Sequence, residues 1–402
     1  MDTPISGRPR TGPWGPLVVH DVAIVGAGPV GATLALALAD SDLDVVVLDA
    51  RPKGGTLRGE RSLALSHGAR LILERLAVWR ELAAVTGAVT PITDIDISQA
   101  GGFGMARLSA AAHDLPALGY VVSYRALQAA LDAALARAGT AVRHGVTADA
   151  VGGTPAYAAV QVAGAGAEPI LARLAAVADG TGAAVAGVAR QRHDYRQVAL
   201  IAKVMPLVGQ VGVAYERFTP EGPVALLPEG DHYGLIWTTT EKRADDLLAL
   251  DDAAFLAELA HHFGTRAGGF ARATDRRTFP LALEFARATV GSRCVVLGNA
   301  AQTLHPVAGQ GFNVGLRDAS ELAQVLLDTP RERIGERAVL DRYARGRRAN
   351  RWAGIAFTHG LVSVFGNDSP LLRWPRGLAL TLLDTLPPAK RAFTRAMLFG
   401  MR

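Results

Sequence analysis

The first strong pattern in the chain is an uncharged apolar stretch that runs from residue 22 to residue 39. Residues 20–25, which include the preceding His20 and Asp21, form a short, largely β-branched run that is typical of a buried parallel strand. The end of the stretch, residues 32–39, is rich in alanine and leucine, and a second apolar strand follows at residues 45–48. At 18 residues, with glycine and proline inside it, the stretch is at the short limit for a membrane span. The pattern therefore favours a strand, a turn, a buried helix and a second strand.

Three glycines and one acid stand between and after these segments: Gly26, Gly28, Gly31 and Asp49. The first glycine permits a tight turn, the second lets a pyrophosphate approach the backbone, and the third lets helix and strand pack closely. The helix N-terminus offers free N–H groups to phosphates, and Asp49 can accept hydrogen bonds from ribose hydroxyls. We predict a dinucleotide site, with a ligand-free glycine turn as the alternative. The motif alone does not separate FAD from NAD.

Weaker patterns fill the next part of the chain. Apolar residues at helical spacing predict a helix over residues 69–79, and a strand followed by a helix begins at Tyr120. Alanine- and valine-rich segments from Gly145 suggest a small sheet. A further strand ends at Asp179 and Gly180.

Residues 195–290 have a different character. Strand-like runs recur between turn residues at 197–204, 211–217, 224–227 and 233–240, and helical spacing returns at 253–263. This pattern predicts a second, mostly antiparallel domain that covers a ligand held by the first.

The densest signal begins at Arg293, where a strand runs into a glycine-rich segment that ends at Asp318. A helix is predicted from about Phe312 to Leu327. Three glycines within seven residues ahead of and inside this helix, Gly309, Gly311 and Gly315, imply a close approach between backbone and ligand.

Charge changes the picture at the C-terminal end. The 402 residues carry a formal charge of +5, which is too mild to make nucleic acid the default partner. Residues 331–402 hold 14 basic and 5 acidic side chains, so the rest of the chain is slightly acidic. A basic end can touch an anionic surface, and a solvated arginine-rich helix face is the alternative.

Cysteine content excludes several kinds of site. Cys294 is the single cysteine, so an intrachain disulfide, a multi-cysteine zinc site and an iron–sulfur cluster are excluded. It lies in an apolar run and is predicted to be a small buried hydrophobe. We predict no metal site.

Four segments together resemble a known family: the strand and glycine turn at 20–49, Arg61–Ser66, Gly298–Pro306 and Leu386–Lys390. The chain resembles the FAD-dependent ubiquinone-biosynthesis hydroxylases of the para-hydroxybenzoate hydroxylase fold over roughly residues 18–400. Most members carry Gly-Asp-Ala-Ala-His in the last glycine motif. Gly298–Pro306 is most similar to the 2-octaprenyl-6-methoxyphenol hydroxylase branch.

The resemblance implies roles for residues at matching positions. Gly26, Gly28 and Gly31 would hold the FAD pyrophosphate and Asp49 the adenosine ribose, while Asn299 would lie near the ribityl chain. The resemblance also implies contacts with FAD for Arg61 and Arg125, and with FAD or NAD(P)H for Asp179 and Gly180. The residues expected against the isoalloxazine ring are Pro306, Gly309, Gln310, Gly311, Phe312 and Asn313.

This chain departs from the family pattern at several positions. Ala183 and Ala186 replace the usual Ser and Arg after Asp179-Gly180, which puts pyridine-nucleotide contacts there in doubt. Gly59 stands where an acid is common, and Asn299 replaces an acid. An amide still hydrogen-bonds a hydroxyl. These changes therefore affect the prediction of FAD binding less than the prediction of NAD(P)H contacts.

The implied activity is that of an FAD-dependent monooxygenase in ubiquinone biosynthesis. It would hydroxylate a polyprenylated phenol of the 2-polyprenyl-6-methoxyphenol type, using NAD(P)H and dioxygen through a flavin hydroperoxide. The alternatives are another ring position, a soluble aromatic substrate, or a non-catalytic flavoprotein scaffold. The sequence marks no catalytic base, and the titratable or phenolic candidates near the flavin are His193, Tyr195, His232 and His305.

These expectations define the architecture. We predict an α/β fold with a three-layer, Rossmann-like FAD-binding domain, an inserted and mostly antiparallel substrate domain, and a helical C-terminal region. The FAD-binding domain is assigned to residues 18–95, 120–190 and 285–345, and the substrate domain to 96–119 and 191–284. Residues 1–17 are predicted to be a disordered leader, and residues 346–402 a basic helical region.

The expected location is the cytoplasm, with the C-terminal region touching the inner face of the membrane as a hypothesis. Core packing of that region is its alternative. The expected partners are the phenol, dioxygen and other ubiquinone-biosynthesis proteins.

Overall fold

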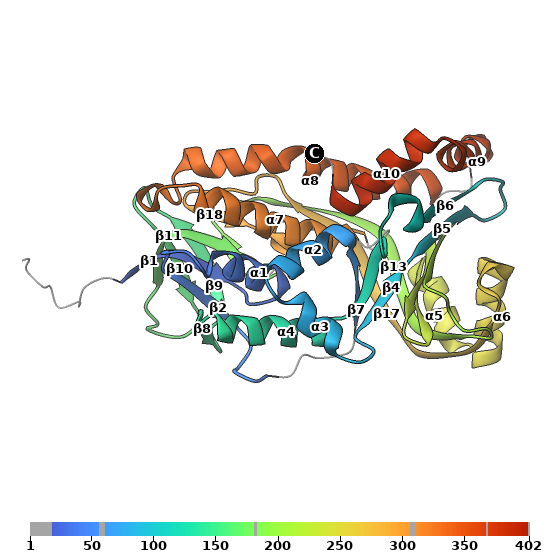
Figure 1. Ribbon diagram of the computed structural model, residues 1–402, viewed down its shortest axis with the longest axis horizontal. Helices are drawn as coiled ribbons and strands as arrows, with labels where there is room; N and C mark the ends of the chain where they lie inside the picture. The colour runs from blue at the N-terminus through green and yellow to red at the C-terminus, as the bar shows by residue number, and fades with distance from the viewer. Residues whose placement is uncertain (1–17, 56–60, 181–182, 306–309, 367–368, 401–402) are drawn as a thin grey trace, which may run out of the picture.

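A computed structural model describes residues 18–55, 61–180, 183–305, 310–366 and 369–400 of the chain (Figure 1). The predicted leader at 1–17 lies outside the described residues. The fold is α/β, as predicted, and consists of two large sheets, a small three-stranded sheet and helices packed on them.

The first large sheet has a parallel centre. The order is β12-β9-β10-β11-β1-β2-β8, and β18 pairs with β11. The pairs β11–β1, β1–β2, β2–β8 and β11–β18 are parallel, whereas β9–β10 and β10–β11 are antiparallel. The strands are β1 (Val19–Val25), β2 (Val45–Asp49), β8 (Ala141–His144), β9 (Ala148–Gly153), β10 (Ala158–Val162), β11 (Ile170–Val177), β12 (Ala184–Val185) and β18 (Cys294–Val296).

Apolar side chains bury both faces of this sheet. On one face, Val22 and Ile24 pack with α1 (Pro29–Leu38), α4 (Tyr124–Arg137) and α7 (Gln310–Leu327). On the other face, Ala23 and Val25 pack with residues of β9, β10 and β18. Cys294 is fully buried in this second cluster, as predicted, and burial raises the pKa of its thiol. The apolar part of β1, residues 22–25, is explained by this two-sided burial.

The second large sheet is mostly antiparallel, in the order β19-β17-β13-β16-β15-β14-β5-β6, with one parallel pair, β14–β5. One face packs on α5 (Glu241–Ala249) and α6 (Asp252–Phe263). The strands are β5 (Asp94–Gln99), β6 (Met105–Ser109), β13 (Arg190–Pro206), β14 (Val213–Thr219), β15 (Gly222–Glu229), β16 (His232–Thr239), β17 (Phe270–Ala286) and β19 (Gln302–Thr303).

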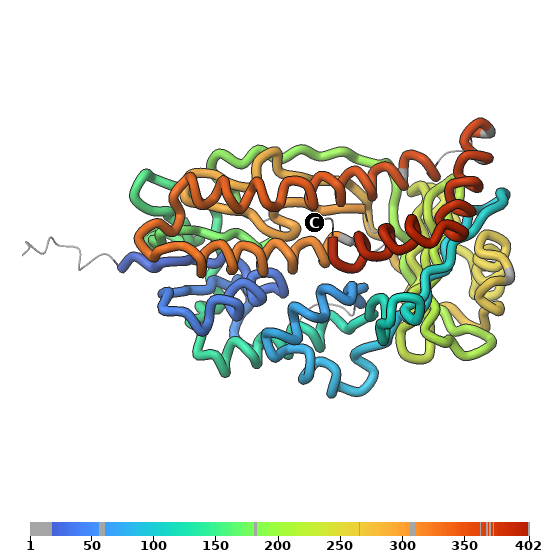
Figure 2. The backbone as a smooth tube through the Cα atoms, turned by 45° about the horizontal axis from the view of Figure 1, so that its top comes forward, coloured from blue at the N-terminus to red at the C-terminus, as the bar shows by residue number. Residues whose placement is uncertain are grey.

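The small sheet joins the two large ones, and three C-terminal helices lie across them. Its order is β3-β7-β4, from β3 (Ser62–Ser66), β7 (Gly119–Ser123) and β4 (Val89–Ile92). The helix α8 (Arg337–Phe365) runs along the length of the molecule in Figure 1. Figure 2 shows α9 (Pro370–Thr385) beside β5 and β6, and α10 (Pro387–Phe399) returning toward the centre.

The prediction of a single helix over residues 69–79 is wrong. The structure has two helices there, α2 (His67–Arg75) and α3 (Trp79–Ala84). Ala77 between them has φ of 56°, a left-handed conformation that ends an α-helix. The apolar spacing continues across the break because both helices bury residues in the same core, among them Leu73 and Leu82.

Candidate functional site

Three parallel strands end level with one another at one edge of the first sheet. Val25 of β1 pairs with Leu48 of β2 and with Val177 of β11. Gly26 and Asp179, about 150 residues apart in sequence, therefore lie at the same edge. In sheets of this kind, ligands bind beyond the carboxyl ends of the strands.

The three glycines of the first turn face different surroundings. Gly26 has φ of 98°, and a Cβ added there would lie 2.8 Å from the carbonyl oxygen of Ala178. A Cβ on Gly31 would lie 1.9 Å from the carbonyl oxygen of Gly26. A Cβ on Gly28 would meet no described atom within 4 Å. The protein's own packing thus requires glycine at 26 and 31, whereas the space at Gly28 is open to a ligand.

The helix α1 begins at this open space. Gly28 is its N-cap residue, with no side-chain hydrogen bond, and Pro29 is its first residue. Proline suits this position because the N–H that it lacks has no partner inside a helix. The remaining first-turn N–H groups and the positive end of the helix dipole favour a phosphate beside Gly28.

Asp49 is buried at the end of β2 and already has a partner. Its Oδ1 accepts a hydrogen bond from the Arg51 backbone N–H at 3.1 Å, and its Oδ2 accepts one from the Arg51 Nε at 2.9 Å. Arg51 also pairs with Asp132 at 3.3 Å. A carboxylate has about four acceptor positions, so ribose hydroxyls would share Asp49 with Arg51. The sequence analysis missed Arg51 because no motif marks it.

The two arginines with predicted FAD contacts lie in different places. The Arg61 guanidinium lies 3.8 Å from the centroid of the Tyr124 ring, and both residues line the cleft at the sheet edge. Arg125 is exposed in the first turn of α4 and is not among the lining residues of this cleft. The FAD contact of Arg125 stays a prediction.

Asp179 lies in a loop that hydrogen bonds keep close to the last glycine motif. Its Oδ2 accepts a hydrogen bond from the Ala183 N–H at 2.7 Å. Arg190, which the sequence analysis did not single out, donates to the carbonyl oxygens of Gly180 at 3.2 Å and Asn299 at 3.1 Å. One arginine thereby ties the two predicted FAD segments together.

The last glycine motif packs against α1. Gly298 has φ of 56°, and an added Cβ there would lie 3.0 Å from the Val30 side chain. A Cβ on Gly315 would lie 3.0 Å from the Cα of Gly298. These contacts bring the start of α7 against the start of α1, so both helix N-terminal regions border one cleft.

The other predicted residues of this motif divide into three groups. Asn299, Gly311 and Phe312 line the cleft. Asn313 is buried, where its Oδ1 accepts from the Ser66 N–H at 2.8 Å and its Nδ2 donates to the Ala64 carbonyl at 3.0 Å. Gln310 begins α7, and Pro306 and Gly309 lie outside the described residues.

The cleft has a volume of about 510 Å³, within the usual range for small-molecule and cofactor sites. Nine of the predicted FAD-binding residues line it: Gly26, Gly28, Asp49, Arg61, Asp179, Gly180, Asn299, Gly311 and Phe312. The open space at Gly28 and the set of donors and acceptors fit a dinucleotide.

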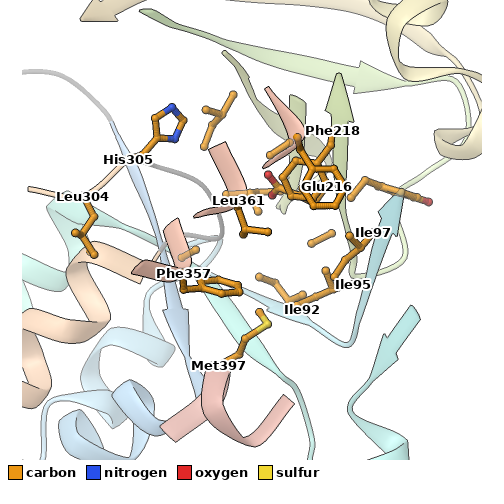
Figure 3. A pocket seen from close by; sticks show the side chains of 18 of the residues that line it. Ile92, Ile95, Ile97, Glu216, Phe218, Leu304, His305, Phe357, Leu361 and Met397 are labelled. Atoms are coloured by element: carbon orange, nitrogen blue, oxygen red, sulfur yellow. The ribbon is translucent and has the colours of Figure 1, made fainter. Parts of the chain in front are cut away.

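A second cavity, of about 460 Å³, adjoins the first. The two share Leu63, Asn299, Gly311 and Phe312 as lining residues. Its wall is mostly aliphatic and aromatic, from β5, β14 and β15 on one side and α8, α9 and α10 on the other (Figure 3). A ring bound here would lie beside the inner end of a ligand in the cleft.

Three of the four candidate titratable residues form a cluster beside this cavity. The Tyr195 ring lies edge-on to His305 at 5.3 Å and to His193 at 5.1 Å, measured between ring centroids. His359, which the sequence analysis missed, lies 3.3 Å from the Tyr195 hydroxyl through its Nδ1. His232 lies apart from this cluster, beside Asp231. Burial lowers the pKa of His305 to about 4, so its ring is neutral at physiological pH.

Within the described part of the chain, no group of three or more His, Cys, Asp or Glu side chains is placed to hold a metal ion. The helices in that same part include none that is both long and apolar enough to cross a bilayer.

A model of the FAD binding domain family matches residues 19–358, most of the chain. The ubiquinone hydroxylase UbiL of Rhodospirillum rubrum is 33% identical, over 94% of this chain and 89% of that protein. The chain belongs to the FAD-binding ubiquinone hydroxylase family. The predicted cofactor, FAD, and the predicted class of enzyme, a monooxygenase, are thereby confirmed.

A second relative supports this family, and a solved structure supports the fold. The 3-demethoxyubiquinol 3-hydroxylase of Escherichia coli is 30% identical, over 92% of this chain and 96% of that protein. The solved structure of p-nitrophenol 4-monooxygenase from Pseudomonas putida superimposes with a TM-score of 0.75 at 17% identity, over 96% of this chain and 100% of that chain. That likeness confirms the predicted fold.

Proposed function

We propose that the enzyme hydroxylates the ring of a polyprenylated phenol, of the 2-polyprenyl-6-methoxyphenol type, in ubiquinone biosynthesis. NAD(P)H and dioxygen are its proposed co-substrates. The observation that carries the proposal is the apolar cavity of about 460 Å³ that adjoins the cofactor cleft. A prenylated phenol is mostly apolar, and burial of its surface in such a cavity is favourable.

The cleft residues would hold the cofactor, with the pyrophosphate at Gly28 and the N-terminus of α1. Asn299 and Phe312, which line both cavities, would then border the isoalloxazine end. Bound FAD would supply the oxygen chemistry by taking electrons from NAD(P)H and passing one atom of dioxygen to the ring. The chain itself would position the ring and exclude water.

The C-terminal helices would hold the first part of the prenyl tail. Phe357, Leu361 and Phe365 of α8 line the cavity, as do Leu380 and Leu383 of α9 and Phe393 and Met397 of α10. Their apolar side chains match a hydrocarbon chain and offer nothing to a charged substrate.

The test compares 2-methoxyphenols with and without a short prenyl tail at the other ring carbon beside the hydroxyl. The purified holoenzyme is expected to oxidise NAD(P)H and consume oxygen in step with product at a higher kcat/KM when the tail is present. Each buried isoprene methylene contributes roughly 0.8 kcal/mol, so a single prenyl unit is expected to lower KM by at least about tenfold. Equal rates with both phenols would contradict the proposal.

A second candidate is hydroxylation at another ring position. It is favoured by the similarity to a relative named 3-demethoxyubiquinol 3-hydroxylase. Assignment of the product's ring protons by NMR separates the two positions. In a strain that lacks the hydroxylase, the accumulated intermediate identifies the same step independently.

We also propose that α9 rests on an anionic membrane. Leu371, Trp374, Leu378 and Leu382 are spaced by three or four residues along α9, and all four are exposed. The opposite face of the same helix lines the cavity through Leu380 and Leu383. Exposed Arg391 and Arg395 follow on α10. Apolar side chains beside cations are typical of helices that lie in a membrane interface.

Vesicles with and without anionic lipid test this contact. Trp374→Ser together with Leu378→Ser is expected to abolish sedimentation with anionic vesicles, while FAD content stays unchanged. Salt is expected to weaken binding of the unmodified enzyme. Point changes are preferable to deletion of residues 373–402, since α9 and α10 also wall the cavity. Binding to another ubiquinone-biosynthesis protein, with no affinity for vesicles, would reassign the surface to a protein partner.

A further inference from the structure

One carboxyl group interrupts the apolar wall of the second cavity. Glu216 lies in the middle of β14, and its neighbours on the same face, Ala214 and Phe218, also line the cavity. Its partners on the adjacent strands, Ala225 of β15 and Ile97 of β5, line it too. Paired residues and residues two apart share one face of a sheet, so the register directs the Glu216 side chain to the cavity. Figure 3 shows it there beside Phe218 and Leu361.

The Glu216 carboxyl has an incomplete set of hydrogen bonds. Its Oε1 is inaccessible and has no hydrogen-bond partner among the described residues. Leaving a buried polar atom without a partner costs roughly 1–3 kcal/mol, and more for a charged group. Such a group calls for an explanation. The neighbouring side chains on this face, Ala214, Phe218, Ala225 and Ile97, carry no hydrogen-bonding group, so a molecule bound in the cavity can supply the missing partner.

In its ionised form, which predominates above its pKa of about 8, the Glu216 carboxyl needs a hydrogen-bond donor as that partner. An ionised carboxylate accepts hydrogen bonds and donates none. In a prenylated methoxyphenol the ring hydroxyl is the one donor, because the methoxy group and the tail have no polar hydrogen. Glu216 therefore matches the hydroxyl, and the apolar residues around it match the rest of the molecule.

We propose that Glu216 binds the ring hydroxyl of the phenol and takes up its proton during hydroxylation, an inference that rests on the proposed function. The O–H bond breaks, its electron pair stays on the ring oxygen, and the proton bonds to a Glu216 oxygen. The phenolate donates electron density to the ring carbon that receives the oxygen atom from dioxygen. That carbon then loses its own proton, which goes to the second oxygen atom of dioxygen as that atom leaves in water. Glu216 returns a proton to the ring oxygen, so the carboxylate is regenerated.

The surroundings of Glu216 suit this role. Burial raises the pKa of its carboxyl to about 8, closer to that of a phenol than an ordinary carboxyl would be. His305 also lines the cavity, but burial lowers its pKa to about 4. One cation also lies near the cavity. It is Arg376 of α9, whose guanidinium lies over the ring of Phe365, a residue of the cavity wall.

Of the other titratable groups near β14, Tyr215 also contributes to the lining of the cavity, whereas Arg217 and Asp96 do not. The Tyr215 ring packs against Phe263 of α6, with the two centroids 5.6 Å apart, and burial raises its pKa above 10. Arg217 donates to a carbonyl of α6, and Asp96 pairs in register with Tyr215. Glu216 is thus the group expected to titrate near pH 8 on the cavity side.

The experiment uses the holoenzyme and a short-tailed prenyl methoxyphenol. Glu216→Gln keeps the shape but cannot accept the proton, so kcat is expected to fall by at least about 100-fold with KM changed little. The rise of kcat/KM between about pH 7 and 9 should disappear. Glu216→Leu loses the hydrogen bond as well, and the substrate Kd is expected to rise about tenfold. Glu241→Gln, an exposed residue of α5, is the matched control.

A ligand comparison on the unmodified enzyme needs no variant. The O-methyl ether of the same phenol cannot donate a hydrogen bond, and its Kd, from perturbation of the flavin spectrum, is expected to be about tenfold weaker. Equal binding of phenol and ether would overturn the proposal. So would a Glu216→Gln enzyme with unchanged kcat and pH profile, and the hydroxylase function would then stand. An unmodified enzyme that binds FAD but hydroxylates no prenylated phenol would overturn both.

Discussion

Gly28 differs from the other glycines of its turn in what it faces. A Cβ at Gly31 would collide with the backbone of Gly26, whereas a Cβ at Gly28 would enter open space in the cleft. The backbone of Gly28 has φ of −63°, a value that any residue adopts. The protein itself therefore tolerates a side chain at 28. We propose that the bound pyrophosphate, and not the packing of the protein, requires glycine at this position.

Gly28→Ala and Gly31→Ala form a matched pair that tests this difference. Gly28→Ala is expected to leave the thermal midpoint of the apoprotein within about 2 °C and to weaken FAD binding by at least about tenfold. Gly31→Ala is expected to lower the midpoint of the apoprotein itself, because two backbone segments must separate. Calorimetry and fluorescence titration with FAD measure the two effects. Unchanged FAD affinity in Gly28→Ala would argue against a pyrophosphate at this turn.

Glu216 predicts a particular dependence of stability on pH. Its folded pKa of about 8 exceeds the ordinary value of 4.5, so between these pH values the unfolded chain binds fewer protons than the folded chain. The contribution of Glu216 to the free energy of unfolding is full below about pH 4.5 and declines until about pH 8. Glu216→Gln removes this decline. Its stability relative to the unmodified protein should therefore increase from pH 5 to pH 8 in denaturant titrations, whereas Glu241→Gln should show no such trend.

Single residues were predictable where the demand on them is local. Gly26, with its positive φ, and Gly31, with its close approach to Gly26, meet demands within the turn, and their spacing in the sequence revealed them. Arg51, Arg190 and Glu216 depend on partners far along the chain, such as Asp132 or the strand β5. No spacing in the sequence marks such contacts.

At the scale of elements, apolar runs predicted the strands that are buried on both faces. They failed for β13 and β17, each 17 residues long, which are paired along most of their length. The residues in the first half of each strand are mostly exposed or half-buried, and many are charged. Hydrogen bonding to a partner strand, rather than an apolar pattern, extends β13 beyond the predicted run at 197–204 and forms β17, where no strand was predicted.

The helix α9 is held to the second sheet by a close backbone contact. A Cβ on Gly377 would lie 2.6 Å from the carbonyl oxygen of Phe103, and one on Gly104 would lie 2.2 Å from that of Gly377. The Phe103 and Trp374 rings meet beside this contact, 5.1 Å apart. The wall of the cavity formed by α9 depends on this approach.

Gly377→Ala is therefore expected to displace α9, lower the thermal midpoint and weaken binding of the prenylated phenol, with FAD affinity unchanged. Gly360→Ala in α8 is the control, because its Cβ would meet no described atom within 4 Å and alanine favours a helix. Calorimetry and substrate titration of the two holoenzymes measure the effects. Equal substrate affinity in both variants would mean that α9 does not shape the binding cavity.

At the scale of the whole molecule, the basic C-terminal end has a structural role besides the membrane contact proposed for it. Part of its charge is structural: buried Arg347 pairs with Asp318 at 2.7 Å and Glu321 at 3.0 Å, and Arg331 pairs with buried Asp21 at 2.7 Å. These pairs neutralise one acid of β1 and two acids of α7. The sequence showed the excess of cations but not their partners, because those pairs form only when the fold brings α8 beside α7 and Arg331 beside β1.

The two cavities are also a property of the whole fold. The cleft lies at the edge of the first sheet, the apolar cavity lies between the second sheet and the C-terminal helices, and they meet at Asn299, Gly311 and Phe312. Motifs predicted the cleft, since glycine turns and acids mark it. The apolar cavity has no motif, because its wall is assembled from side chains that look like ordinary core residues in the sequence.

The most direct test of the central claim is incorporation of labelled oxygen. The holoenzyme is supplied with NAD(P)H, a short-tailed 2-prenyl-6-methoxyphenol and ¹⁸O₂, and the products are analysed by mass spectrometry. The account predicts a phenol that carries one ¹⁸O atom on the ring, formed in proportion to the NAD(P)H oxidised. Oxidation of NAD(P)H that yields only hydrogen peroxide and leaves the phenol unchanged would contradict it.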